Sequence, residues 1–204
     1  MNAATTLARP TKGEETRAQI LAAAVEQAST AGFESLTIGT LAEKTGMSKS
    51  GLFAHFGSKL DLQIAALDEC ARQFAEAVFL PALKVPRGVK RLHAIFENWI
   101  TWPQRANLSG GCPIDSAGHE YDHQPGAMRD AVMERQRLLD RELSKAVQLA
   151  VETGELAKDT DPRQVAFELL AIILVFYRSK SLLGPEAALK RARTAFGRLL
   201  EQNR

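Results

Sequence analysis

The sequence has few cysteines and lacks a hydrophobic run long enough to span a bilayer. Cys70 and Cys112 are too few for a disulfide framework, so we expect a reducing compartment and predict a cytoplasmic protein. The longest apolar run, Leu169 to Tyr177, is far shorter than the ~20 residues that a membrane-spanning helix needs. The polar residues before Arg9 and Pro10 do not resemble a secretory signal. The sequence therefore predicts neither membrane insertion nor secretion.

The chain also lacks a bulk excess of either charge. It contains 26 basic and 24 acidic residues, and the first 60 residues are as balanced as the rest. However, the stretch from Lys44 to Lys59 contains no acidic residue, and it includes His55. A row of DNA phosphates requires a local positive field of this kind. On charge alone, a solvated helix face explains the stretch better.

Apolar residues recur at helical spacing through most of the chain, and no alternating strand pattern stands out. Glycines and prolines divide these segments, and Thr11 with Glu14 has the spacing of a capping box. Residues 1–10 are predicted to be a disordered arm. We predict an all-α fold of about nine helices, in which Pro103 ends the fifth. The helices are expected near 12–31, 38–45, 49–56, 59–80, 89–102, 113–122, 127–153, 162–183 and 186–202.

Residues 37–56 have the spacing of a helix-turn-helix, with a tight turn at Gly46-Met47-Ser48. The first helix braces the second through apolar residues that belong to the core. The second helix presents its first turn, residues 48–51, outward. Gly51 lets the backbone approach DNA closely, and the N–H groups at a helix start favour phosphate.

The sequence at this point resembles the TetR family of transcriptional regulators. The similarity covers residues 14–67, about a quarter of the chain. It implies a DNA-binding domain over 1–57, and a helical domain over 58–204 that holds a ligand pocket and dimerises through its last two helices. The matching residues are Thr16-Arg17, Ile20-Leu21, Ala23-Ala24, Gly32-Phe33, Thr37, Leu41-Ala42, Gly46-Met47-Ser48-Lys49, Leu52-Phe53, His55-Phe56 and Ser58-Lys59.

The resemblance also implies which residues contact DNA. Lys49 and Ser50 would contact base edges, and a second group would contact the phosphate backbone. Two residues depart from the family pattern: Phe53 replaces a usual tyrosine and lacks its hydroxyl, and Gly51 replaces a larger side chain. A glycine there weakens the helix by up to ~1 kcal/mol relative to alanine. The full predicted set is Thr37, Ser48, Lys49, Ser50, Gly51, Phe53, His55 and Lys59.

The C-terminal part has aromatic and polar residues that could line a pocket for a small-molecule effector. Aromatic residues at helical spacing are also typical of ordinary core. The run Gly110-Gly111-Cys112-Pro113, followed by Glu120-Tyr121, is similar to one TetR-like C-terminal subgroup, but it indicates no particular ligand. The predicted pocket residues are Phe96, Trp99, Trp102, Cys112, Asp115, His119, Tyr121, Phe176 and Tyr177.

Three alternatives use some of the same residues. Cys112, Asp115, His119 and His123 have ligand types at helical spacing, which would suit zinc. Cys112 near a helix start would have a lowered pKa and could act as a redox or electrophile sensor, with Cys70 resolving it; two inert core cysteines are the simpler interpretation. A helical module that binds protein and not DNA is the third, and the acid-free stretch argues against it.

The last two helices predict a homodimer. Residues 162–183 are too apolar for a monomer surface, and the last helix carries an apolar stripe. A two-fold dimer contacts a palindromic site, one half per recognition helix. The predicted interface consists of Phe176, Ala188, Ala192, Phe196 and Leu199, and Phe196→Asp is expected to give monomers.

We therefore interpret the chain as a ligand-responsive, homodimeric regulator of transcription, a repressor that a small molecule releases from its operator. We predict no enzymatic activity, no cofactor and no metal. The resemblance further implies that ligand shifts the fourth helix, residues 58–80, and so changes the separation of the two recognition helices.

Overall fold

The computed structural model describes residues 11–204, so the predicted arm over residues 1–10 lies outside the described residues. Over 11–204 the chain is all-α, as predicted, and contains no strand. It has nine helical rods when the continuous segment from α4 to α5 is counted as one. The elements are α1 (Lys12–Ala31), α2 (Ile38–Thr45), α3 (Lys49–Phe56), α4 (Lys59–Phe74), a π-helical segment (Ala75–Phe79), α5 (Leu80–Leu83), α6 (Val89–Arg105), α7 (Pro113–Tyr121), α8 (Ala127–Glu152), α9 (Pro162–Leu183) and α10 (Pro185–Gln202).

The helix starts are capped as their sequences predict. Thr11 accepts a hydrogen bond from the Glu14 amide at 3.3 Å, and the Thr11 amide donates to the Glu14 carboxylate at 2.7 Å. This reciprocal pair satisfies two backbone donors that the first turn of α1 would otherwise leave unpaired. In the helix-turn-helix, Gly46 ends α2 in the left-handed conformation, with φ of 68°. Glycine adopts this conformation without steric cost, which explains the tight turn before α3.

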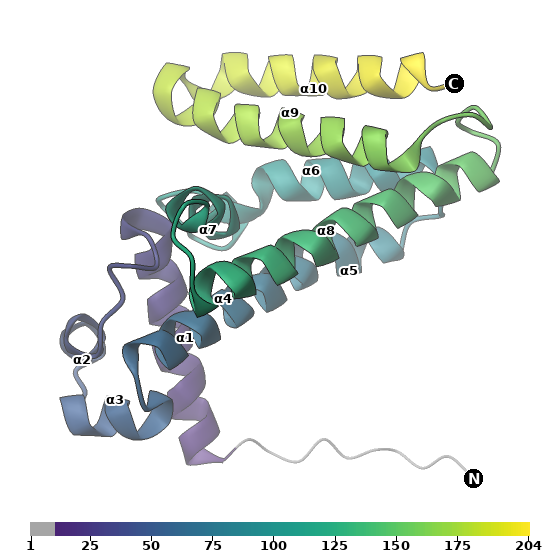
Figure 1. The fold of residues 1–204 in the computed structure, drawn as a ribbon. Helices are drawn as coiled ribbons and strands as arrows, with labels where there is room; N and C mark the ends of the chain where they lie inside the picture. The colour runs from purple at the N-terminus through teal and green to yellow at the C-terminus, as the bar shows by residue number, and fades with distance from the viewer. Residues whose placement is uncertain (1–10) are drawn as a thin grey trace, which may run out of the picture.

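The helices form a small end and a large end (Figure 1). α2 and α3 lie at one end, against α1 and the start of α4. α9 and α10 pack side by side at the other end, and α8 runs between the two along the length of the molecule. α7 lies beside the C-terminal end of α1, where the two ends of the molecule meet. The buried apolar side chains of the described residues form one continuous cluster.

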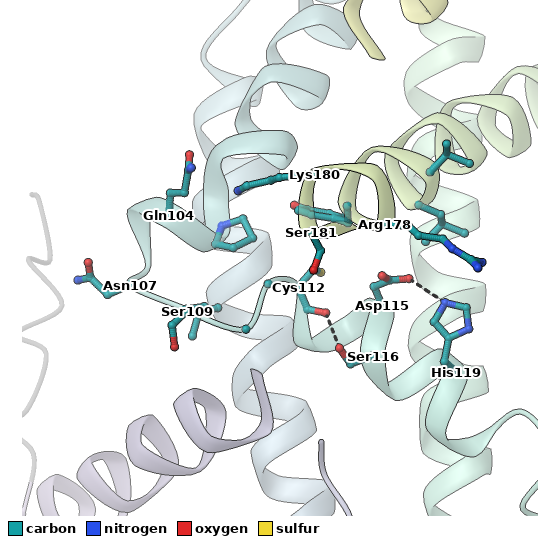
Figure 2. Close-up of a pocket in the computed structure, with 17 residues that line it drawn as sticks. Gln104, Asn107, Ser109, Cys112, Asp115, Ser116, His119, Arg178, Lys180 and Ser181 are labelled. Carbon is teal, nitrogen blue, oxygen red and sulfur yellow. Dashed lines mark hydrogen bonds and ion pairs between the residues drawn. The ribbon is translucent and has the colours of Figure 1, made fainter. Parts of the chain in front are cut away.

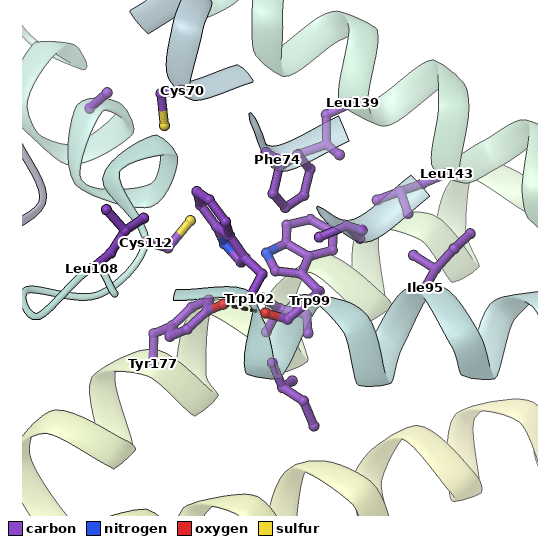
Figure 3. Close-up of a cluster of buried hydrophobic side chains, with 14 of the residues drawn as sticks. Cys70, Phe74, Ile95, Trp99, Trp102, Leu108, Cys112, Leu139, Leu143 and Tyr177 are labelled. Atoms are coloured by element: carbon purple, nitrogen blue, oxygen red, sulfur yellow. Dashed lines mark hydrogen bonds between the residues drawn. The ribbon is translucent and has the colours of Figure 1, made fainter. Parts of the chain in front are cut away.

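The prediction that Pro103 ends the fifth helix is wrong, because α6 continues to Arg105 with this proline inside it. Proline has no N–H, so it leaves the carbonyl four residues earlier, that of Trp99, without its helical donor. The Tyr177 hydroxyl on α9 donates to this carbonyl at 2.6 Å (Figure 3). The helix therefore passes the proline because another helix supplies the missing donor.

Side-chain donors also surround Pro81, in the rod formed by α4 and α5. It lies inside the first turn of α5, directly after the π-helical segment. The carbonyl of Ala77, four residues earlier, accepts from the Arg105 guanidinium at 2.9 Å. One residue further on, the Val78 carbonyl accepts from the Asn98 amide at 3.0 Å. Side chains of α6 thus donate to two carbonyls of the irregular rod just before Pro81.

The predicted interface residues on the last helix are already buried within a single chain. Ala188, Ala192, Phe196 and Leu199 are each at most 5% exposed within a single chain. Phe196 stacks on Phe96 of α6, with ring centroids 4.3 Å apart and planes 12° from parallel. The stripe therefore packs chiefly inside the chain, and Phe196→Asp would place a carboxylate in the core instead of separating two folded subunits.

The exposed apolar surface lies on α9 instead. Phe167 and Val175 are 65% and 62% exposed, and Leu182 and Leu183 are more exposed still. This agrees with the prediction that the helix is too apolar for the surface of one chain. Within residues 11–204, none of the helices combines the length and the apolar character that crossing a bilayer demands.

The Tyr177 hydrogen bond gives a test of the Pro103 interpretation. Tyr177→Phe should lower the free energy of unfolding by about 1–3 kcal/mol, because it leaves a buried carbonyl without a donor. In a Pro103→Ala background the cost should shrink, since the alanine introduced there supplies its own backbone N–H. The measurement is urea unfolding of the two single variants and the double variant. Equal losses in both backgrounds would show that the hydroxyl does not replace the missing donor.

Candidate nucleic-acid interface and effector cavity

The first turn of α3 is an exposed, capped helix start. Ser48 accepts from the Gly51 amide at 3.1 Å, and its hydroxyl lies 3.2 Å from that of Ser50. Ser48, Lys49 and Ser50 are exposed, and Gly51 is half-buried. The side chains opposite this turn, Leu52 and Phe56, are buried. The apolar side therefore fixes the helix, and the small polar residues face outward at its positive end.

Lys49 extends over the start of α2. A Cβ placed on Gly39 would lie 3.7 Å from the Lys49 Cε and 3.9 Å from its Nζ. The end of the lysine side chain thus lies beside the α2 N-terminus, at ordinary contact distance from residue 39. Thr37 caps that N-terminus by accepting from the Thr40 amide at 3.1 Å, and it is half-buried.

The remaining predicted DNA contacts lie along α3 and at the start of α4. The Phe53 ring is 56% exposed, so its outward position does not follow from core packing. His55 is half-buried beside Phe56. Lys59 is exposed, but its Nζ forms an ion pair of 2.5 Å with Glu34. A phosphate would therefore compete with Glu34 for Lys59.

An open cavity of about 1060 Å³ lies between the end of α6, the start of α7 and the C-terminal half of α9. Figure 2 shows its polar lining: Asp115 and His119 face each other on α7 with an N–O distance of 3.7 Å, and Arg178 and Lys180 lie on α9. Gln104 and Asn107 add amide groups. We call this cavity the outer chamber. Burial raises the pKa of Asp115, and the neighbouring His119 opposes that effect.

A smaller cavity of about 240 Å³, the inner chamber, continues from the outer one. Both share the lining residues Cys112, Asp115, His119, Leu174 and Tyr177. The inner walls are mostly apolar, with Ile114, Leu139, Leu170 and Ile173 among them. Trp99 also lines this chamber, and its buried indole N–H has no acceptor among the described residues. The two chambers together offer an apolar inside with a polar mouth, as ligand pockets usually do.

Five of the nine predicted pocket residues, namely Trp99, Cys112, Asp115, His119 and Tyr177, line these chambers. The other four lie elsewhere. Phe96 packs on Phe196, and Trp102 is fully buried against Phe74 in an edge-to-face contact (Figure 3). The Tyr121 hydroxyl donates to Glu34 near the helix-turn-helix, and Phe176 lines a groove between α9 and α10. Missed lining residues include Arg178 and Lys180, because charges at a helix end look like ordinary surface.

The surroundings of Cys112 contradict the alternative of a reactive thiol and agree with the simpler interpretation of two inert core cysteines. The thiol is buried beside Trp102, and burial raises its pKa to about 11 (Figure 3). Burial also raises the pKa of Cys70. Because the thiolate is the reactive form, neither cysteine is activated in this conformation. The N-terminus of α7 does not outweigh the desolvation of the sulfur.

The four residues of the zinc alternative do not form a cluster. α7 ends at Tyr121, so His123 lies beyond the helix, and its side chain is 93% exposed. Among residues 11–204 there is no group of three or more His, Cys, Asp or Glu side chains arranged to hold a metal ion. The spacing alone was misleading because it assumed one unbroken helix.

Comparisons with known proteins agree with this geometry. Residues 20–66 match the family model for bacterial regulatory proteins of the tetR family, and residues 88–196 match the model for the tetracyclin repressor-like C-terminal domain. None of the curated proteins compared with the chain is similar enough to match.

Several solved structures share the fold. A TetR transcriptional regulator from Chloroflexus aurantiacus is 25% identical, with a TM-score of 0.81 over 94% of this chain and 97% of that one. A putative regulator from Saccharomonospora viridis in complex with choline is 19% identical, with a TM-score of 0.76 over 93% and 97%. AibR in complex with isovaleryl coenzyme A and operator DNA is 24% identical, with a TM-score of 0.69 over 90% and 97%. Because one family model covers more than half of the chain and another covers the helix-turn-helix, the protein belongs to the TetR family of transcriptional regulators.

Proposed function

We propose that this protein is a homodimeric repressor that binds a palindromic operator and leaves it when a small molecule occupies the chambers. The observation that carries the proposal is the exposed first turn of α3. It presents Ser48, Lys49 and Ser50 on a helix whose opposite side is buried, within a stretch from Lys44 to Lys59 that has no acidic residue. A small polar turn of this kind fits the major groove.

The proposed DNA contacts divide into two kinds. Lys49 and Ser50 are the proposed contacts to base edges, where a lysine favours the acceptors of guanine. Thr37, Phe53, His55 and Lys59 are the proposed contacts to the backbone, together with the amides at the start of α3. The domain division at residues 57 and 58 belongs to the same proposal. A regulator of this kind acts where the operator is, so we also propose a cytoplasmic location.

The chambers are the proposed effector site. Their apolar inside and polar mouth suit a small molecule, and two similar structures carry ligands, choline in one and isovaleryl coenzyme A in the other. Release of the operator requires that the effector binds the DNA-incompetent conformation more tightly. We propose no enzymatic activity, since the pair Asp115 and His119 lacks an activated nucleophile, with the Cys112 thiol protonated.

We propose that the dimer interface lies on the exposed side of α9 and not on the apolar stripe of α10. Phe167, Val175 and Leu183 supply the apolar surface, and a groove between α9 and α10 that Phe176, Ala188 and Ala192 help to line adjoins it. Two copies of this surface related by a two-fold axis would form a four-helix interface.

Selection of binding sites from a random DNA duplex pool at fixed salt tests the proposal. An enriched inverted repeat is the expected result, because a two-fold dimer contacts two half-sites. Absence of any enriched sequence, with the dimer intact, would contradict it. A module that binds only protein would give that second result.

Lys49→Ala should weaken binding to the selected operator by about 1–3 kcal/mol per half-site and relax the preference at the contacted base pair. Binding is measured by fluorescence anisotropy over a range of salt concentrations. The matched control is Lys145→Ala on the exposed side of α8, which should leave the affinity unchanged. Equal affinities of the Lys49 variant and the wild type for all operators would remove Lys49 from the contact set.

Val175→Asp should convert the dimer into folded monomers, because it places one carboxylate of each subunit in an apolar interface. Sedimentation velocity at micromolar concentration measures the oligomeric state, and circular dichroism checks the fold. The control is Leu138→Asp, an exposed apolar residue of α8, which should remain dimeric. A Val175 variant that stays dimeric would place the interface elsewhere.

A further inference from the structure

The carboxylate of Glu120, near the end of α7, binds the backbone that leads from α1 to the helix-turn-helix. It accepts from the Phe33 amide at 2.8 Å and from the Glu34 amide at 2.6 Å. A Cβ at residue 32 would lie 2.9 Å from both carboxylate oxygens, so Gly32 leaves the space that they occupy. Two hydrogen bonds from one charged group to adjacent amides are stronger and more directional than neutral ones.

Other elements hold the same backbone. Gln63 of α4 is buried and donates to the Phe33 carbonyl at 2.9 Å. The Tyr121 hydroxyl donates to Glu34 at 3.3 Å, and Glu34 forms the ion pair with Lys59. The segment between α1 and α2 is therefore held by α4 on one side and by α7 on the other.

A second attachment lies at the loop before α7. A Cβ at Gly110 would lie 1.7 Å from the backbone oxygen of Ser29 and 2.6 Å from the Cα of Thr30. Residues with a side chain cannot approach backbone this closely, so this loop is in direct contact with the last turn of α1 because residue 110 is glycine. The wall formed by residues 110–121 thus touches the last turn of α1 at one end and the segment that follows α1 at the other.

The residues between these two attachments line the chambers. Gly111, Cys112, Asp115, Ser116 and His119 face the outer chamber, and Ile114 and Gly118 face the inner one. In contrast, α4, every residue of which the structure describes, contributes to neither lining. A molecule in the chambers would contact α7 directly and α4 only through other elements.

We propose that α7 is the element through which the effector chambers control the DNA-binding helices, and that Glu120 is the positioning residue of this connection. The inference rests on the proposed function and specifies its coupling route. α7 is nine residues long, or about 13 Å, and a helix of this length moves as a rigid body. Displacement of its cavity side therefore moves the carboxylate that holds Phe33 and Glu34.

The connection leads directly to the helix-turn-helix. Phe33 and Leu36 are fully buried, and Thr37, the next residue, caps α2. A shift of residues 33 and 34 would move these buried residues and the start of α2. Because α2 packs on α3, it would also move α3. The fourth helix, which the resemblance implies as the moving part, would follow through Gln63 and Lys59.

The first test removes the charge of the Glu120 side chain without changing the shape of that side chain. In Glu120→Gln the amide group can accept from only one of the two N–H groups. Hydrogen exchange at the amides of Phe33 and Glu34, measured by NMR, should become roughly tenfold faster or more. The control is Glu142→Gln, an exposed carboxylate of α8, which should leave exchange at both amides unchanged. Unchanged exchange in the Glu120 variant would overturn the inference that the carboxylate of Glu120 holds these two amides in place.

The second test asks whether the chambers act through Glu120. Leu170 of α9 lines the inner chamber opposite α7, so Leu170→Trp places bulk against the α7 wall without altering α7. Operator affinity should change by about fivefold or more in the wild-type background, a typical size for coupling between two sites. In the Glu120→Gln background the change should be several-fold smaller. An equal change in both backgrounds, or no change in the wild type, would overturn the proposed route.

A third variant covers the case in which the Leu170→Trp protein does not fold. Gly110→Ala separates the loop from α1 at the other attachment, and it should likewise speed exchange at residues 33 and 34 and alter operator affinity. An alanine with no effect on either would contradict the two-point attachment. Wild-type binding to the selected operator distinguishes the two proposals. If the wild type bound no operator, the proposed function would fail. The exchange measurements would still decide whether Glu120 holds the amides of residues 33 and 34.

Discussion

The rest of the structure depends on helix α6 running past Pro103 without a break. Trp102, directly before the proline, fills the centre of the core, and the residues after the proline lead into the loop at residues 106–112, which reaches α1. The hydrogen bond from Tyr177 to the Trp99 carbonyl makes this possible at a position where proline removes the normal donor. The Tyr177 phenol thus joins α9 to α6 and also lines both chambers. The same contact therefore supports the wall of the cavity and the packing of the core.

Much of the fold could be predicted from the sequence because its signals are local. Thr11, Ser48 and Ser58 mark helix starts, and glycines mark helix ends, since caps involve residues only three or four positions apart. The helix-turn-helix was predicted for the same reason. Pro103 shows where local rules fail: whether a proline ends a helix depends on whether a residue far along the chain, here Tyr177, supplies a donor.

The cavity and the interface were predicted less well because periodicity shows that a side of a helix is apolar, but not what covers it. The stripe through Ala192 and Phe196 packs mainly within its own chain, while the contact surface proposed for the partner lies on α9. Glu120 had a sequence signal, its place after the Gly-Cys-Pro run. Its chemical role could not be read from that signal, because its partners, the amides of Phe33 and Glu34, are more than 80 residues away.

The charges around Glu34 connect the two proposed activities. Glu34 accepts from Lys59, Gln63 and Tyr121, and its amide binds Glu120, so α4 and α7 meet at one residue. A phosphate that takes Lys59 removes the cation that balances Glu34 beside the Glu120 carboxylate, and the electrostatic balance at the end of α7 changes with it. Coupling between two binding sites is reciprocal. If the proposed network lets an effector disturb the DNA-binding helices, it must therefore also let the operator disturb the effector chambers, to the same extent in free energy.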